Sequence, residues 1–316
     1  MHERWSKIVI IGAGMVGSST AFSLLQNGVA RELVLIDRDK DKAAGEALDL
    51  GHGVPLAYNV KITAGDYPDC QGADIVIVTA GAAQKEGETR LDLVHKNTTI
   101  MEDIVPKLVK YAPDSILLVV TNPVDIMTYV VMKLSGLPQN QVIGSGTVLD
   151  TSRLRYAVSL QTRVDTRNIH AYVLGEHGDT EFVAWSRAHV AGIPLRDYYE
   201  KVLGRSFDTE ARDILEQQVR EAAYEVIAKK DAPYYAVALA LSRISRAILR
   251  GERSVLTVST LVKGYYGVED VCLSIPCVVG RKGIERKIPF YLDEGEIKNW
   301  QKSAAAMEDV ITKLKI

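Results

Sequence analysis

Short, almost wholly apolar runs alternate with helical stretches through the first half of the chain, and this alternation strongly constrains the fold. Runs rich in β-branched residues predict strands at Ile8–Ile11, Leu33–Ile36, Val60–Thr63, Ile75–Val78, Ile116–Val120 and Val142–Ile143. Helical patterns lie between them, at Val16–Gln26, Lys40–Leu50, Leu93–Tyr111 and Ile126–Leu134. Apolar strands separated by helices are typical of a parallel sheet that is covered on both faces. We therefore predict an α/β fold with a doubly wound parallel sheet.

After about residue 148 the pattern changes to longer helices and strands of mixed character. Helices are predicted at Leu149–Leu160, Thr209–Lys229, Tyr234–Leu249 and Asp293–Leu314. Strands are predicted at Ala171–Leu174, Val255–Thr260, Val271–Val279 and Ile284–Ile288. This layout is typical of an α+β domain. We predict two domains, at residues 1–147 and 148–316, which pack tightly and leave a cleft where they meet, because no flexible linker separates them.

Composition excludes several classes of partner. The 316 residues carry 38 basic and 40 acidic side chains, with no long block of one sign, which argues against nucleic-acid and membrane partners. The cysteines Cys70, Cys272 and Cys277 match no zinc motif and are too few for a disulfide framework. Glycines interrupt the apolar run at Ile8–Ile11, which therefore predicts neither a signal peptide nor a membrane span. We expect a cytoplasmic protein without a metal centre.

A glycine pattern follows the first predicted strand. Gly12, Gly14 and Gly17 form G-x-G-x-x-G between that strand and a helix. In this context the pattern indicates a dinucleotide-binding (Rossmann) turn, whose backbone approaches a pyrophosphate at a helix N-terminus. Asp37 ends the second strand twenty residues later, where a carboxylate binds the adenosine ribose and favours NAD over NADP. Arg38 partly offsets that preference, and a glycine turn without a ligand is the alternative.

Histidine 177 lies in a second glycine turn, within Val173–Asp179, directly after a short apolar run. Its ordinary pKa is close to neutrality, so this side chain can both accept and return a proton. The flanking Gly175 and Gly178 let the backbone turn and let a ligand approach. From this turn alone, a structural histidine at a strand end is an equally good interpretation.

Further segments give the chain a resemblance to a known family. They are Thr79–Arg90, Thr121–Pro123, Leu149–Arg153 and Gly264–Asp270. Together with the His177 turn, in this order, the chain closely resembles the lactate and malate dehydrogenases over nearly its whole length. The resemblance implies reversible hydride transfer between L-lactate and NAD, giving pyruvate and NADH. The alternatives are a dehydrogenase for malate or a bulkier 2-hydroxy acid, and an NAD-sensing protein without catalytic activity.

The resemblance also implies roles for individual residues. His177 exchanges the proton of the substrate hydroxyl, and Asp150 orients the imidazole. Arg153 binds the substrate carboxylate, for which a planar guanidinium is well suited. Arg90 polarises the carbonyl, and Asn122 hydrogen-bonds in the same region. The implied cofactor contacts are Gly12, Gly14, Met15, Val16, Gly17, Asp37, Thr79, Ala80, Gly81 and Asn122.

Each of these residues also has a simpler interpretation. Asp150 is a favourable residue for a helix N-cap. Arg153 and Arg90 are of a type that usually lies in solvent. Asn122 before Pro123 is an ordinary turn pair. The spacing favours function for Asp150 and Arg153, which are three residues apart and therefore share a helix face.

Two positions bear on the choice of substrate. The family resemblance associates Gln84 with pyruvate, because a second substrate carboxylate would need a cation in place of a neutral amide. The stretch from Gln84 to Arg90 is expected to form a lid over the substrate. Pro233 replaces the threonine usual in lactate dehydrogenases, which leaves room for larger 2-oxo acids. Its simpler interpretation is the start of the following helix.

A regulatory site is implied at Arg155 and His170. These residues match positions at which allosteric bacterial members of the family bind fructose 1,6-bisphosphate across a subunit interface. Arg155 lies about 200° around the helix from Arg153, so the two arginines do not bind the same substrate. The alternative is an interface salt bridge or solvated charges. By the same resemblance we expect a homotetramer.

Overall fold

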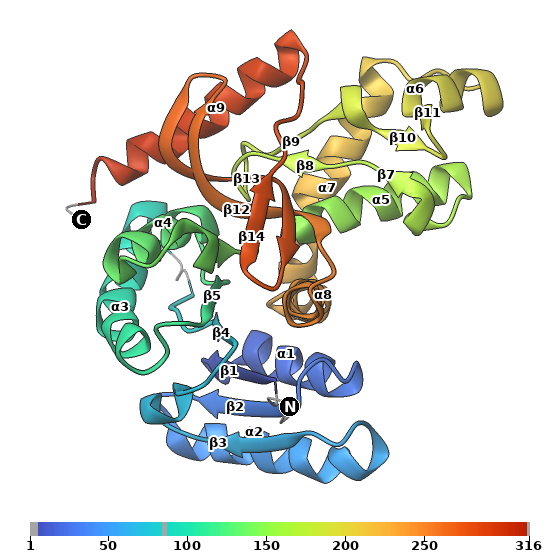
Figure 1. Cartoon of the computed structure of the whole chain (residues 1–316). Helices are drawn as coiled ribbons and strands as arrows, with labels where there is room; N and C mark the ends of the chain where they lie inside the picture. The colour runs from blue at the N-terminus through green and yellow to red at the C-terminus, as the bar shows by residue number, and fades with distance from the viewer. Residues whose placement is uncertain (1–5, 84–86, 315–316) are drawn as a thin grey trace.

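The computed structural model describes residues 6–83 and 87–314 (Figure 1). Its first half contains the parallel strands β1 (Lys7–Ile11), β2 (Glu32–Ile36), β3 (Lys61–Ala64), β4 (Ile75–Val78), β5 (Ile116–Val119) and β6 (Val142–Gly144). The helices of this half are α1 (Met15–Gln26), α2 (Lys40–Gly53), α3 (Arg90–Tyr111) and α4 (Val124–Ser135). The predicted bounds agree with these to within one helical turn.

The parallel strands are buried because their side chains are apolar on both faces. Every residue of β4 and β5 is buried, and helices cover the sheet. Strand β1 pairs with β2 on one side and with β4 on the other. The chain therefore reverses its direction of strand addition at β1, and a crevice for a ligand is expected at the carboxyl ends of these strands.

The second half begins with a long helix and a group of very short strands. These elements are α5 (Val148–Thr162), β7 (Ile169–His170), β8 (Val173–Leu174), β9 (Phe182–Val183), β10 (His189–Val190), β11 (Ile193–Pro194) and α6 (Leu195–Asp197). The elements that follow are α7 (Thr209–Lys230), α8 (Tyr235–Arg250), β12 (Ser254–Tyr265), β13 (Val268–Gly280), β14 (Gly283–Lys287) and α9 (Glu294–Ile311). Helix α5 packs on α7, and α8 packs on α1 of the first half.

Two of the C-terminal strands, β12 and β13, are longer than predicted, whereas β14 lies within one residue of its predicted bounds. Strand β12 extends to Tyr265, well past the predicted end at Thr260, and β13 begins earlier than predicted. The ends of this hairpin carry polar side chains such as Lys263 and Glu269 and contain register shifts, which hide the strand pattern in the sequence. Conversely, the predicted strand at Ala171–Leu174 shrinks to Val173–Leu174.

The hairpin also extends the first sheet. Ser259 of β12 pairs with Gly144 of β6, so in the described residues the main sheet has nine strands in the order β14-β13-β12-β6-β5-β4-β1-β2-β3. A doubly wound parallel sheet is confirmed, but its edge is antiparallel and comes from the second half. The division at residues 147 and 148 stays a prediction, because hydrogen bonding crosses it.

The structure also bears on membrane insertion and on the state of the three cysteines. No helix within residues 6–83 and 87–314 has the length and apolar character needed to cross a membrane. Cys70, Cys272 and Cys277 are buried free thiols, and burial raises the pKa of each. They serve as small apolar core residues.

Candidate active site

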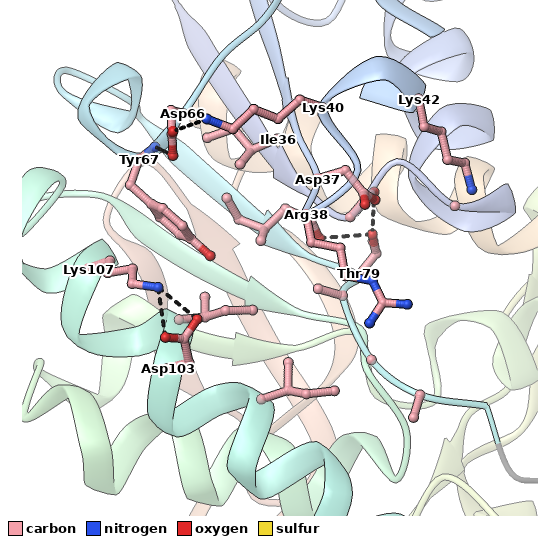
Figure 2. Close-up of a pocket in the computed structure, with 18 of the residues that line it drawn as sticks. Ile36, Asp37, Arg38, Lys40, Lys42, Asp66, Tyr67, Thr79, Asp103 and Lys107 are labelled. Carbon is pink, nitrogen blue, oxygen red and sulfur yellow. Dashed lines mark hydrogen bonds and ion pairs between the residues drawn. The ribbon is translucent and has the colours of Figure 1, made fainter. Parts of the chain in front are cut away.

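A cavity of about 790 Å³ opens at the carboxyl ends of β1, β2 and β4 (Figure 2). Figure 2 shows Asp37, Arg38 and Thr79 among its lining residues, with Asp103 and Lys107 of α3 on the opposite wall. Other lining residues include Gly12, Gly14, Ala80 and Gly81. The cavity therefore lies at the point where the strand order reverses, and it is large enough for part of a dinucleotide.

The three motif glycines act in different ways. Gly12 has a φ of +106°, and an added Cβ would lie 2.8 Å from the backbone nitrogen of Ala80. At Gly17 an added Cβ would lie 1.8 Å from the carbonyl oxygen of Gly12, so this glycine lets α1 pack against the turn. At Gly14 a Cβ would meet nothing within 4 Å. Gly14 therefore leaves open the space that a pyrophosphate needs at the N-terminus of α1.

The Asp37 carboxylate accepts hydrogen bonds from the backbone N–H groups of Ala13, at 2.7 Å, and Asp39, at 3.0 Å. These bonds hold it at the rim of the cavity. Thr79, through its hydroxyl, donates to the carbonyl oxygen of Gly12 at 2.9 Å and joins the β4 loop to the glycine turn. The residues present fit a dinucleotide. Of the expected contacts, Met15, Val16, Gly17 and Asn122 are absent from the cavity wall formed by the described residues.

His177 and Asp150 form a hydrogen-bonded pair. His177 Nδ1 lies 2.6 Å from Asp150 Oδ2, and the other oxygen of Asp150 accepts from Arg153 NH1 at 2.8 Å. One buried carboxylate is thus shared between an imidazole and a guanidinium. Asp150 is the third residue of α5, whose N-cap is Thr147, so the interpretation of Asp150 as an N-cap is wrong.

These contacts change the ionisation of both members of the pair. Burial lowers the pKa of His177, but the charge and hydrogen bond of Asp150 outweigh it and raise that pKa to about 9. Burial raises the pKa of Asp150, yet the charge and hydrogen bond of His177, with the charge of Arg153, bring it below its ordinary value. At neutral pH the pair is therefore an imidazolium and a carboxylate.

Arg90 is the first residue of α3, where Thr89 is the N-cap, and its guanidinium pairs with the buried carboxylate of Glu176. Glu176 is the residue before His177, and the hydroxyl of Thr180 donates to its second oxygen. The structure thus brings Arg90 to the same turn as His177.

Comparisons with known proteins decide the family. Residues 6–144 match the NAD binding domain of the lactate/malate dehydrogenases, and residues 147–315 match their alpha/beta C-terminal domain. The chain belongs to the lactate/malate dehydrogenase family. The family's N-terminal domain makes NAD the cofactor, and the chain is an oxidoreductase.

Relatives match over nearly their whole length. An L-lactate dehydrogenase of Thermoanaerobacterium saccharolyticum is 52% identical over 98% of this chain and 100% of the relative. One of Acetivibrio thermocellus is 53% identical over 98% of each chain. The crystal structure of the minor L-lactate dehydrogenase of Enterococcus mundtii superimposes with a TM-score of 0.96 and 42% identity, over 99% of this chain and 100% of that chain.

Sequence reasoning missed a buried acid that supports the turn of this family member. Asp125 of α4 accepts the backbone N–H of His177 at 2.7 Å and the hydroxyl of Ser259 at 2.6 Å. Burial raises the pKa of Asp125, although both hydrogen bonds act in the opposite direction. A single acid in the first turn of α4 gives no sign of a partner 52 residues away.

The structure describes one of the two positions that bear on the choice of substrate. Gln84 lies outside the described residues, and so does part of the expected lid. Pro233 is partly buried in the link between α7 and α8. It does not start α8, which begins at Tyr235 with Tyr234 as N-cap.

The predicted effector residues lie on neighbouring elements. Arg155 donates from Nε to the carbonyl oxygen of Ala171 at 3.2 Å, and its guanidinium lies 5.3 Å from the ring centre of Tyr172. It lines a cavity of about 500 Å³ formed by residues of α5, α8 and β12. His170 is exposed on β7. Arg155 and Arg153, which both lie on α5, thus contact different partners, as their spacing predicts.

Proposed function

We propose that this protein catalyses the reversible oxidation of L-lactate to pyruvate with NAD. The observation that carries the proposal is the Asp150 carboxylate, which contacts both the proton-exchanging group and the predicted substrate clamp. A 2-hydroxy acid presents a hydroxyl and a carboxylate on adjacent carbons. The joined His177 and Arg153 match that pair of groups, since each is held by one oxygen of the same side chain.

The chain's own residues account for proton transfer and orientation. Asp150 accepts the Nδ1 proton of His177, which leaves Nε2 to donate to the substrate oxygen during pyruvate reduction. Among the described residues, Asp150 is the one hydrogen-bond partner of the Arg153 guanidinium, so its other N–H groups remain for the substrate carboxylate. Arg90 supplies positive charge toward the carbonyl oxygen. Bound NAD supplies the hydride acceptor, and NADH the donor.

The choice of pyruvate rests on Gln84. Oxaloacetate carries a second carboxylate, and a neutral amide facing it would leave a buried charge without a partner. The methyl group of pyruvate makes no such demand. The L-lactate dehydrogenases of Thermoanaerobacterium saccharolyticum and Acetivibrio thermocellus support the same choice through their similarity over the full chain.

The test is NADH oxidation with pyruvate, oxaloacetate and 2-oxobutyrate measured side by side. We expect the highest kcat/KM with pyruvate. A higher value with oxaloacetate would overturn the argument from Gln84, and a higher value with 2-oxobutyrate would show that Pro233 enlarges the pocket. Zero turnover with all three acids, with NADH still bound, would instead indicate an NAD-sensing protein.

We further propose a cytoplasmic homotetramer activated by fructose 1,6-bisphosphate at Arg155 and His170. Light scattering of the purified protein tests the assembly. The sugar bisphosphate should lower the KM for pyruvate, and Arg155→Gln should remove this response. Arg163→Gln is a matched control because Arg163 is an exposed arginine at the end of α5 that does not line the second cavity. An unchanged KM in the wild type contradicts the effector site.

A further inference from the structure

Glu181 is a third titratable group beside the His177–Asp150 pair, and the reaction above does not use it. It lies between the histidine turn and β9, and only 7% of the residue is exposed. A carboxylate oxygen of Glu181, one of Asp150 and a ring nitrogen of His177 all lie within 4.8 Å of one another. Its backbone N–H donates to the carbonyl oxygen of Gly178 at 3.1 Å, which fixes Glu181 to the turn.

Charged groups face Glu181 from several elements. Helix α5 contributes Asp150 and Arg153, α7 contributes Arg220 and Tyr224, and the turn contributes His177. Asp125 of α4 also acts on His177. Burial, followed by the negative charge of Asp150, raises the pKa of Glu181 to about 8, against the opposing effects of His177 and the two arginines. The carboxyl is therefore neutral when the pair is charged at neutral pH.

At neutral pH the neutral carboxyl adds no charge beside the pair. When Glu181 loses its proton, its new negative charge lies within 4.8 Å of the imidazolium. A negative charge at this distance favours retention of the imidazole proton.

We propose that Glu181 is a positioning residue for the catalytic proton: its buried carboxyl, within 4.8 Å of both the His177 imidazole and the Asp150 carboxylate, helps to keep that proton on His177 and extends pyruvate reduction into the alkaline range. This inference rests on the proposed function. It differs from the role of Asp150, which contacts Nδ1 directly, because Glu181 acts through charge across several ångströms.

The test compares Glu181→Gln with the wild type in the pH profile of kcat/KM for pyruvate at saturating NADH. This profile reports the ionisation of the acid in the NADH complex. We expect the alkaline limb to move down by about one pH unit, which lowers kcat/KM at pH 9 by roughly 5-fold. Near pH 6.5 the two proteins should differ by about twofold or less, because Glu181 is then protonated and resembles glutamine.

Glu296→Gln is a matched control. Glu296 is also a buried carboxylate of the second half, at 6% exposure, but it binds Ser186 and caps α9. We expect this variant to lose stability without moving the alkaline limb. An unmoved limb in Glu181→Gln, or a uniform loss of activity at every pH, would overturn the proposal.

A second measurement reports on His177 without turnover. The rate of diethyl pyrocarbonate modification, followed by mass spectrometry on the His177 peptide, gives the pH midpoint of the imidazole directly. This midpoint should be lower in Glu181→Gln than in the wild type. In Glu181→Asp, which retains a shorter acid, it should lie between those two values. A wild type without pyruvate activity would remove the proposed function, whereas equal midpoints in wild type and Glu181→Gln would remove this inference alone.

Discussion

The cofactor cradle and the histidine cluster are built in different ways. The cradle is formed mainly by backbone: three glycines within six residues, with Asp37 and Thr79 held by backbone hydrogen bonds. The cluster is formed by side chains from α4, α5 and the turn after β8, and its groups are buried and half-buried charges in contact. Shape determines the first region, whereas charge compensation determines the second.

This difference determines how each region fails when it is altered. A group added to the cradle meets either backbone or open space, so its effect depends on local fit. A group removed from the cluster leaves a buried charge without its partner, which costs several kcal/mol. Substitutions in the cluster should therefore have the larger effects on turnover, and those in the cradle should separate folding from cofactor binding.

The largest effect is expected from Asp150→Asn. An amide of the same shape no longer stabilises the imidazolium or selects the Nδ1–H tautomer, and loss of an orienting carboxylate lowers kcat by roughly 10³- to 10⁴-fold. NADH binding, measured by fluorescence, should stay close to that of the wild type because the cradle is untouched. Asp165→Asn, at an exposed acid, is the control. An unchanged kcat would refute the role of the pair.

Arg153→Lys should have the next largest effect. The lysine preserves the charge beside Asp150 but loses the planar pair of donors, which is worth about 2 kcal/mol to a bound carboxylate. We expect the KM for pyruvate to rise roughly 30-fold, with a smaller change in kcat. Arg155→Lys is the matched control on the same helix, and without effector its KM should equal that of the wild type. Equal values for Arg153→Lys would place the carboxylate elsewhere.

Gly14→Ala and Gly17→Ala separate the two functions of the cradle. Gly14 has an extended backbone that alanine tolerates, and its added Cβ meets no protein atom within 4 Å. The Tm should stay the same, while the Kd for NADH rises about 10-fold, because the methyl group occupies space needed by the pyrophosphate.

In Gly17→Ala the effect on Tm should exceed the effect on NADH binding, the reverse of Gly14→Ala. Its Cβ would lie 1.8 Å from the Gly12 carbonyl oxygen, so the turn must shift and the Tm must fall. Calorimetry without cofactor measures this difference. A Gly14→Ala variant that binds NADH as tightly as the wild type would contradict the position of the pyrophosphate.

The same comparison explains what the sequence could predict. The cradle is contiguous, so the strand, the glycine spacing and Asp37 predicted it from the residues alone. The cluster joins Asp125, Asp150 and His177, which are far apart in the chain, and only the family resemblance linked Asp150 to His177. Nothing local predicted Asp125 or Glu181, because their roles depend on burial against distant charges.

The strand predictions for the second half were inaccurate for a related physical reason. The prediction for β12 ends at Thr260, although the next two residues, Leu261 and Val262, are apolar and buried; only the exposed Lys263 and Gly264 after them lack a strand signal. Its pairing with β6 at a single residue position is a tertiary contact that strand patterns do not encode. Pro233 shows a third case, in which a residue common at helix starts lies outside the helix because Tyr234 forms the cap.

The smallest expected effect is the pH dependence of stability. The folded state raises the pKa of His177 from 6.5 to about 9 and that of Glu181 from 4.5 to about 8. Both groups therefore hold a proton more tightly when folded, and the unfolding free energy falls as pH rises through these ranges. We expect the wild-type Tm to be lower at pH 9 than at pH 6.5, by on the order of a few degrees.

A His177→Asn, Glu181→Gln double variant should lose most of this dependence of Tm on pH. Gly14→Ala should retain it, since the cradle contributes shape and not protons. A double variant with the wild-type slope would show that the cluster is not where the folded protein holds its extra protons.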